Sequence, residues 1–228
     1  MQLPACMFIN TDTHTMQHKL ITLFLSIAVC IAAHAQKDFS EGTLIYRVKL
    51  HTPDQKTLTG TYTFTIKGPD IRKELKLNNG YQDIMLLNCQ NHNVYTLQAR
   101  DGKKYAIQLS MDELMQQQQK FSGYTLRNEA AENKSIAGYA AYHGDVNYKD
   151  GSNAQIVYTK EITPQPMMFE RFPDAHFLPM SFTYQDEHNT SMEFEVMKID
   201  PSPVESATFR IPADYKMISY AEYKQLSK

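Results

Sequence analysis

The sequence predicts a mainly β fold, an antiparallel sheet with two or three short helices. Apolar and polar residues alternate with a period of two over many short segments, which is typical of strands with one buried face. Clusters of Gly, Pro, Asn and Asp separate these segments, as turns do between strands. The chain also has 14 Tyr and no Trp, and tyrosine suits half-buried sheet faces.

Residues 1–35 are predicted to be a secretory signal peptide and are set apart from the fold. His18 and Lys19 give a positive start, and an apolar run follows over 20–33. The run ends in Ala33-His34-Ala35, a small-x-small pattern that places cleavage before Gln36. It is shorter than the ~20 residues of a membrane span, and no later segment is apolar for long enough to be one.

Two details of this segment bear on the export route. Met16 stands directly before the charged region, so a start there gives a signal peptide of ordinary shape and makes 1–15 an over-extended start. The alternative is a lipoprotein signal with Cys30 as the lipidated residue. Val29 argues against it, because the residue before such a cysteine is small. We expect a periplasmic protein with its signal peptide cleaved between Ala35 and Gln36.

The mature chain, residues 36–228, has the length of a single domain with a sizeable core. Cys89 is its only cysteine, so an internal disulfide is excluded and the thiol is expected to be a small buried group. The net charge of −2 comes without a basic stripe, which argues against nucleic acid as a partner. We expect a monomer without a transmembrane segment.

The first half of the mature chain predicts an antiparallel meander. Asn79-Gly80 is the strongest hairpin signal, because both residues tolerate positive φ. Arg100-Asp101-Gly102 predicts the next hairpin turn. The alternating segments that these turns separate are 44–50, 61–66, 71–77, 81–87, 94–99 and 104–109.

Two short helices are predicted by capping boxes, one at Ser110–Glu113 with a helix to about Lys120, and one at Ser219–Glu222. A single helical turn is predicted over Met167–Phe172 after Pro166. The remaining segments predict strands, with a kink near Gly144 in the second of them: 124–126, 136–148, 154–160, 180–184 and 192–198.

No catalytic residue, cofactor or metal site is predicted. The sequence lacks a Gly-x-Ser-x-Gly elbow, a phosphate-binding loop and a His-Glu-x-x-His helix. Among the histidines, only His143 shares a strand face with a second possible ligand, Asp145, and one pair falls short of the three or four ligands that zinc takes. The histidines of the mature chain are His51, His92, His143, His176 and His188.

One segment is unusually dense in methionine and aromatic residues. Two interpretations stay open: core packing beneath a loop, or an adaptable apolar lining for a lipid-like ligand, since Met side chains adjust to what they contact. The candidate lining residues are Met167, Met168, Phe169, Phe172, Phe177, Met180 and Phe182.

Three motifs resemble those of a domain-of-unknown-function family (DUF4412-type) of exported Gram-negative proteins. They are Gly42-Thr-Leu-Ile-Tyr46 at the start of the mature chain, Ile136-Ala-Gly-Tyr139 in its middle, and Phe209-Arg-Ile-Pro-Ala-Asp-Tyr215-Lys near its end. Their order and spacing fit the family as well. Many members carry a cysteine soon after the middle motif, where this chain has Ala140 and Ala141.

This family is similar in architecture to the periplasmic lipoprotein carrier LolA. The resemblance implies a strongly bent antiparallel sheet, a LolA-like half-barrel that wraps short helices and an apolar cavity. The motifs are structural and identify a fold more specifically than a function.

Three functions are therefore considered. The first is a periplasmic protein that binds or carries an apolar ligand, a lipid or an acyl chain. The second is an envelope protein-interaction or scaffold module whose half-barrel is filled by its own side chains. The third, a hydrolase, ranks last because no nucleophile and base are seen together in the sequence.

Overall fold

The computed structural model describes residues 36–100, 102–132, 134–185 and 189–226. All of them belong to one unit that spans Gln36–Lys228. The predicted signal peptide over 1–35 lies outside the described residues, with Met16 and Cys30, and so does His188.

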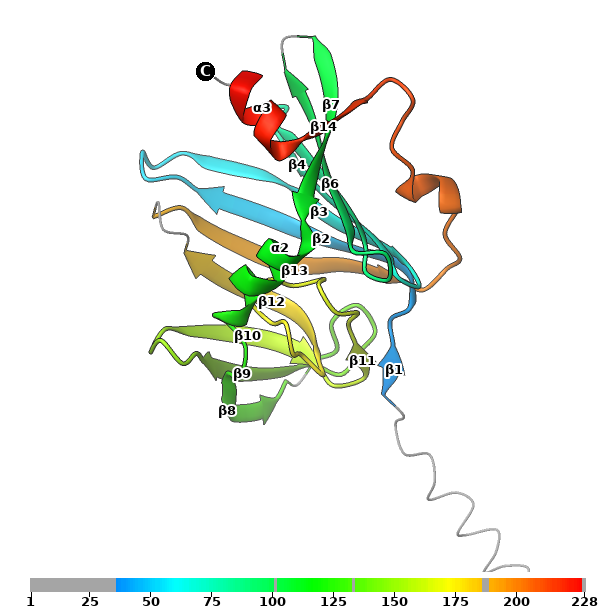
Figure 1. The fold of residues 1–228 in the computed structure, drawn as a ribbon. Helices are drawn as coiled ribbons and strands as arrows, with labels where there is room; N and C mark the ends of the chain where they lie inside the picture. The colour runs from blue at the N-terminus through cyan, green and yellow to red at the C-terminus, as the bar shows by residue number, and fades with distance from the viewer. Residues whose placement is uncertain (1–35, 101, 133, 186–188, 227–228) are drawn as a thin grey trace, which may run out of the picture. The chain divides into compact units, whose positions relative to one another are not determined.

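Strands make up most of the described chain (Figure 1). The first eight are β1 (Lys37–Asp38), β2 (Glu41–His51), β3 (Thr57–Lys67), β4 (Asp70–Leu77), β5 (Gln82–Asn88), β6 (Asn93–Arg100), β7 (Lys103–Ser110) and β8 (Thr125–Ala131). The others are β9 (Tyr142–Asn147), β10 (Asn153–Thr159), β11 (Ile162–Thr163), β12 (Leu178–Gln185), β13 (Ser191–Asp200) and β14 (Lys216–Ser219).

Twelve of these described strands form one sheet in the order β14-β7-β6-β5-β4-β3-β2-β13-β12-β10-β9-β8. Each strand from β2 to β7 pairs antiparallel with the next, which confirms the predicted meander. The pairing of β13 with β2 joins this meander to the second half of the sheet. Only β14 runs parallel to its neighbour within the sheet, and β1 pairs separately with β11.

The sheet is bent, and interruptions of the strand register lie in its second half. The register shifts at Val157 in β10, between Val196 and Lys198 in β13, and between Arg127 and Ala130 in β8. Such bulges bend a strand and increase its twist. The prediction of a mainly β fold, with a strongly bent antiparallel sheet and two or three short helices, is confirmed.

The helices of the described chain are α2 (Met111–Gln119), α3 (Tyr220–Leu226) and the 3₁₀ turn η1 (Ser206–Phe209). Both capping boxes are confirmed. Ser110 Oγ accepts a hydrogen bond from the Glu113 N–H at 3.2 Å, and Ser219 Oγ accepts one from the Glu222 N–H at 3.2 Å. These bonds satisfy amide groups that the first turn of a helix leaves without partners.

Two predicted elements were wrong. The strand expected over 136–148 is only β9, because Ile136 and Tyr139 close a tight turn with φ of 48° at Ala137 and 88° at Gly138. The helical turn expected over Met167–Phe172 is an irregular segment, since Met167 adopts a φ of 68° that no right-handed helix contains.

The main core lies between the concave face of the sheet, α2 and the segment 164–177. Tyr46 on β2 is fully buried at its centre. Four phenylalanine rings meet the Tyr46 ring nearly edge-on, with centroids 5.9 to 6.4 Å away: Phe64, Phe169, Phe182 and Phe194. Edge-to-face contacts of this kind add to the stabilisation that burial provides.

The opposite face of the sheet is covered near the C-terminus. Ile211 and Tyr215 of the closing motif pack against a small apolar cluster on β5, β6 and β7. Because side chains alternate along a strand, this cluster faces away from α2. The cluster consists of Ile84, Leu86, Leu97 and Ala106.

Candidate functional site

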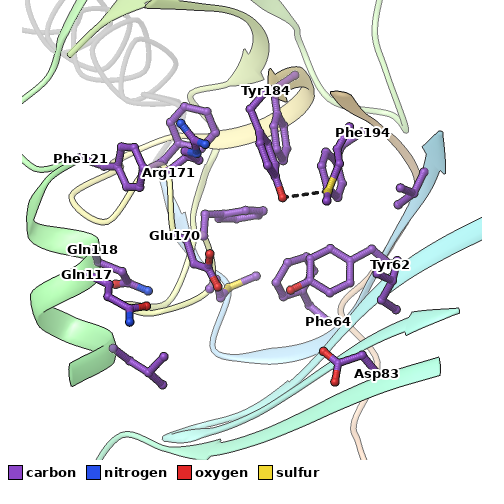
Figure 2. A pocket seen from close by; sticks show the side chains of 18 of the residues that line it. Tyr62, Phe64, Asp83, Gln117, Gln118, Phe121, Glu170, Arg171, Tyr184 and Phe194 are labelled. Atoms are coloured by element: carbon purple, nitrogen blue, oxygen red, sulfur yellow. Dashed lines mark hydrogen bonds between the residues drawn. The ribbon is translucent and has the colours of Figure 1, made fainter. Parts of the chain in front are cut away.

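A cavity of about 390 Å³ lies between the concave face of the sheet, α2 and the segment 164–177. Figure 2 shows its side chains converging from these three sides. The volume lies within the range of about 300–1,000 Å³ that is usual for ligand pockets. Its lining consists of Val48, Tyr62, Phe64, Leu75, Asp83, Leu114, Gln117, Gln118, Lys120, Phe121, Met168, Phe169, Glu170, Arg171, Phe172, Phe182, Tyr184, Met192 and Phe194.

The wall from β12 and β13 is a stack of aromatic rings. Phe194 stacks on Phe182 with centroids 4.7 Å apart, and on Tyr184 with centroids 5.6 Å apart. The Tyr184 hydroxyl donates a hydrogen bond to the Met192 sulfur at 3.0 Å (Figure 2). The strand pairing causes the stack, because Phe182 and Phe194 are register partners. The result is a flat apolar surface that faces the cavity.

The helix α2 closes a second side. Leu114, Gln117 and Gln118 lie one helical turn apart or less and face the cavity together. Gln118 is buried, and its carbonyl oxygen accepts the Phe121 N–H at 2.9 Å. This bond ends the helix and places the Phe121 ring at the cavity edge.

The segment 164–177 closes the third side without regular secondary structure. The Gln165 N–H donates to the Met168 sulfur at 3.2 Å, and the Met168 N–H donates to the Gln165 carbonyl at 3.3 Å. These two bonds turn the Met168 side chain inward, where it is 1% exposed. The adjacent Phe169 and Phe172 rings are also buried and line the cavity.

Arg171 lies at the boundary with a second, smaller cavity of about 170 Å³, which it also lines. Its guanidinium carbon lies 4.4 Å from the Phe121 ring centroid and 4.7 Å from that of Tyr184. Its Nη2 also donates to the Gln185 carbonyl at 3.3 Å. These contacts hold a cation between two aromatic faces at one end of the main cavity.

The opposite wall carries an acidic group. Asp83 on β5 accepts hydrogen bonds from Thr96 Oγ1 and Gln98 Nε2, both at 3.2 Å. Burial raises the pKa of the Asp83 carboxyl, and the negative charge of Glu170 raises it further. Burial also raises the pKa of the Tyr62 hydroxyl well above its usual value, so this group stays neutral. Figure 2 shows Tyr62, Asp83 and Glu170 around the same part of the cavity.

The structure brings together four of the seven residues proposed from the sequence. Met168, Phe169, Phe172 and Phe182 line the main cavity. The other three do not: Met167 is partly exposed, Met180 is fully buried on β12, and Phe177 packs against Tyr158 with ring centroids 4.9 Å apart.

Sequence reasoning missed the lining residues on β2 to β5, on α2 and on β13. Alternation indicates correctly that Tyr62 and Phe64 share one strand face. No local pattern indicates which part of that face α2 covers, because the helix is placed by contacts distant in sequence. No sequence pattern assigns the polar lining residues Asp83 and Gln118 to a cavity.

No metal centre is found among the described residues, because no three His, Cys, Asp or Glu side chains lie together there. His143 Nδ1 lies 3.1 Å from Glu132 Oε1, while the Asp145 carboxylate accepts a hydrogen bond from Asn128. The pair considered from the sequence is thus used in separate surface contacts. Within the described ranges, none of the helices is both long and apolar enough to cross a membrane.

No family model matches the chain, and no curated protein matches its sequence. Among solved structures, the chain is similar to a LolA superfamily protein from Nitrosomonas europaea. That match has 10% sequence identity and a TM-score of 0.37, and it covers 77% of this chain and 92% of that one.

The chain is also similar to the lipoprotein LppX from Mycobacterium tuberculosis. This match has 12% identity and a TM-score of 0.37, and it covers 82% of this chain and 98% of that one. At this TM-score neither likeness carries a conclusion about function. Membership of the domain-of-unknown-function family stays a prediction.

Proposed function

We propose that the protein is exported to the periplasm and there binds an apolar, lipid-like ligand in the main cavity. The observation that carries this proposal is the cavity of about 390 Å³ whose lining is mostly aromatic, aliphatic and methionine side chains. Transfer of an alkyl chain from water to such a lining is favourable by about 0.8 kcal/mol for each buried CH₂ group.

The composition of the lining suits a flexible chain better than a rigid polar substrate. Met168 and Met192 come from opposite sides of the cavity, the first from the segment 164–177 and the second from β13. Methionine is unbranched and adapts to irregular shapes. The Phe182–Phe194 stack supplies a flat surface against which an alkyl chain can lie.

The cavity also favours this function over the scaffold alternative. A half-barrel filled by its own side chains would leave no space of ligand size between α2 and the sheet. The hydrolase alternative has no support at the cavity, where neither serine, cysteine nor histidine belongs to the lining. An envelope partner that delivers or receives the ligand is compatible with the proposal.

Native mass spectrometry tests the proposal directly. The full chain is expressed in a Gram-negative host and purified from the periplasmic fraction in mild buffer. A mass above that of the processed polypeptide, which organic extraction removes, is expected for a bound lipid. An apo mass together with no response of an apolar fluorescent dye would overturn the proposal.

A pair of adjacent variants makes the dye experiment specific to the cavity. Leu114→Trp places an indole in the cavity, so dye binding is expected to weaken about tenfold or more. Met115→Trp is the matched control, because Met115 is 45% exposed on the same helix and does not line the cavity. If both variants bound the dye equally well, the dye would bind outside the main cavity.

A further inference from the structure

Lys73 is a buried lysine on the concave face of the sheet. Only 4% of it is exposed, which is rare for this residue type. It lies on β4 on the same face as Leu75, and its register partners are Phe64 on β3 and Met85 on β5. Because Leu75 and Phe64 both line the main cavity, Lys73 lies directly beside the cavity wall.

The Lys73 ammonium has no partner in the described part of the chain. Neither a hydrogen bond nor an ion pair within 4.0 Å joins it to a described residue. Every fully enclosed side-chain nitrogen or oxygen there does have a partner. The Lys73 nitrogen therefore keeps a small opening. Lys73 does not itself line the main cavity, but it neighbours two residues that do, Phe64 and Leu75, and the charge of the lining residue Glu170 acts on it.

Burial and two more distant groups shift the pKa of the Lys73 ammonium. Burial lowers the pKa of the ammonium, while the negative charges of Glu170 and of a Cys89 thiolate act in the opposite direction. An isolated charge in such a place is unfavourable unless an opposite charge is brought close to it. The side chain is thus suited to a partner that the protein itself does not supply.

The charge balance of the cavity indicates the sign of that partner. The charged lining residues Asp83 and Glu170 are opposed by Lys120 and Arg171, so they balance. Lys73 adds one positive charge beside the wall. A group with a single negative charge restores neutrality, whereas a phosphate monoester, with about −1.5 to −2 charges, would exceed it.

We propose that the cavity takes an amphiphile with one carboxylate head group, a fatty-acid-like ligand, and that Lys73 pairs with this carboxylate while the alkyl chain lies against the aromatic wall. This inference rests on the proposed function and specifies the chemical class of its ligand. Asp83 keeps its two hydrogen-bond donors, Thr96 and Gln98.

The test compares a pyrene-labelled long-chain fatty acid with its methyl ester, using fluorescence titration of the delipidated full-chain product. The wild-type protein is expected to bind the acid about ten- to a hundredfold more tightly, the range of a charge-assisted hydrogen bond. Lys73→Met, which keeps the length of the side chain, is expected to remove this preference, so that the acid and the ester bind about equally. Lys73→Gln provides a second neutral variant.

The matched control is Lys76→Met. Lys76 lies on the same strand, on the other face, where it pairs with Glu74 at 2.7 Å. It is expected to keep the wild-type preference for the acid. Circular dichroism confirms that each variant is folded.

The failures of the two proposals are distinguishable. Equal binding of acid and ester by the wild-type protein would overturn the head-group inference and leave the proposed function standing. A preference for the acid that persists in both Lys73 variants would overturn the role of Lys73. Binding of neither probe would contradict the proposed function itself.

Discussion

The Tyr46 hydroxyl donates a hydrogen bond to the backbone carbonyl of Pro179, so a side chain of β2 is tied to the start of β12 across the core. These residues are 133 positions apart in sequence. The contact joins the two halves of the sheet behind the cavity wall, because Phe182 of β12 and Phe169 both pack on the Tyr46 ring.

Removal of this hydroxyl is expected to destabilise the fold without creating a large void. Tyr46→Phe leaves the Pro179 carbonyl short of a buried donor, which costs about 1–3 kcal/mol of unfolding free energy. Urea denaturation followed by circular dichroism measures the loss. Tyr81→Phe is the control, since Tyr81 is 51% exposed and a change within about 0.5 kcal/mol is expected there. Equal stability of the two variants would show that the contact contributes nothing.

The buried tyrosines predict alkaline unfolding. Burial raises the pKa of the Tyr148 hydroxyl to about 12 and the pKa values of Tyr46 and Tyr62 well above the usual 10.0. The unfolded chain loses these protons near pH ~10 while the folded chain keeps them. Their stabilising effect is therefore complete below that pH and is lost as the pH rises above it.

Ultraviolet titration of tyrosinate tests this expectation. Tyrosines on the surface should ionise reversibly in the folded protein. Tyr46, Tyr62 and Tyr148 should ionise only when the protein unfolds. Their ionisation and the loss of the circular dichroism signal should therefore occur in one cooperative step. Ionisation of all tyrosines at the usual pH with the fold intact would contradict the burial.

The motif residue Gly42 has a steric role that its sequence context does not reveal. Its φ is 142°, and a Cβ at this position would lie 2.4 Å from the Asp200 carbonyl oxygen and 2.9 Å from the Pro201 Cα. Gly42→Ala is therefore expected to lower the unfolding free energy by about 2–3 kcal/mol, since backbone on both strands must shift.

A second glycine separates this clash from simple backbone strain. Gly68 has a φ of 56° with open space around it, so Gly68→Ala is expected to cost only about 1 kcal/mol. Guanidinium denaturation midpoints of the two variants give the comparison. Similar losses for both would mean that β2 and β13 are not packed as closely as described.

The sequence predicted the elements whose signals are local. Asn79-Gly80 forms the hairpin between β4 and β5, where the Gly80 N–H donates to the Leu77 carbonyl at 3.1 Å and Gly80 adopts a φ of 86°. The capping boxes were equally reliable, because each begins a helix through contacts three residues apart. Periodicity then assigned the strands and their buried faces.

Prediction failed where the local signal was weak, or where contacts between residues distant in sequence determine the structure. Ala137 adopts a φ of 48°, which few non-glycine residues do, so alternation alone predicts a strand where the chain turns before β9. The dense Met and Phe segment was recognised, but its division between core and cavity depends on α2 and β13. Alternation along 71–77 places Lys73 on the same strand face as Ile71 and Leu75, yet nothing local indicates that it is buried without a partner.

Cys89 is only partly buried, so the expectation of a buried thiol holds in part, and the thiol is expected to react slowly in the folded protein. Burial raises its pKa, and the Asp70 charge acts in the same direction, while Lys73 opposes them. The thiolate is the reactive form, so labelling by iodoacetamide at neutral pH should be slow until denaturant is added. Mass spectrometry of quenched samples follows the reaction. Rapid labelling without denaturant would show that the thiol is open to solvent.

Among the groups in the cavity, the Asp83 carboxyl gives the clearest prediction of how the stability of the fold changes with pH. Its pKa is raised above 3.8 in the folded protein, first by burial and then by the charge of Glu170. At acid pH the folded and unfolded chains are both protonated here, so the burial carries no charge penalty. As the pH rises through the folded pKa, the carboxylate forms in a poorly solvated place and stability is lost.

Asp83→Asn removes this penalty while an amide oxygen can still accept the hydrogen bonds from Thr96 and Gln98. The variant is expected to exceed the wild-type protein in unfolding free energy by on the order of 1 kcal/mol at neutral pH, and to equal it at acid pH. Urea denaturation across this pH range measures the difference. Thr96→Val, which removes one donor to the carboxylate, should act in the opposite direction at neutral pH. If Asp83→Asn were less stable than the wild-type protein at every pH, the carboxylate would be a favourable partner in the folded protein. Its repulsion with Glu170 would then be too weak to matter.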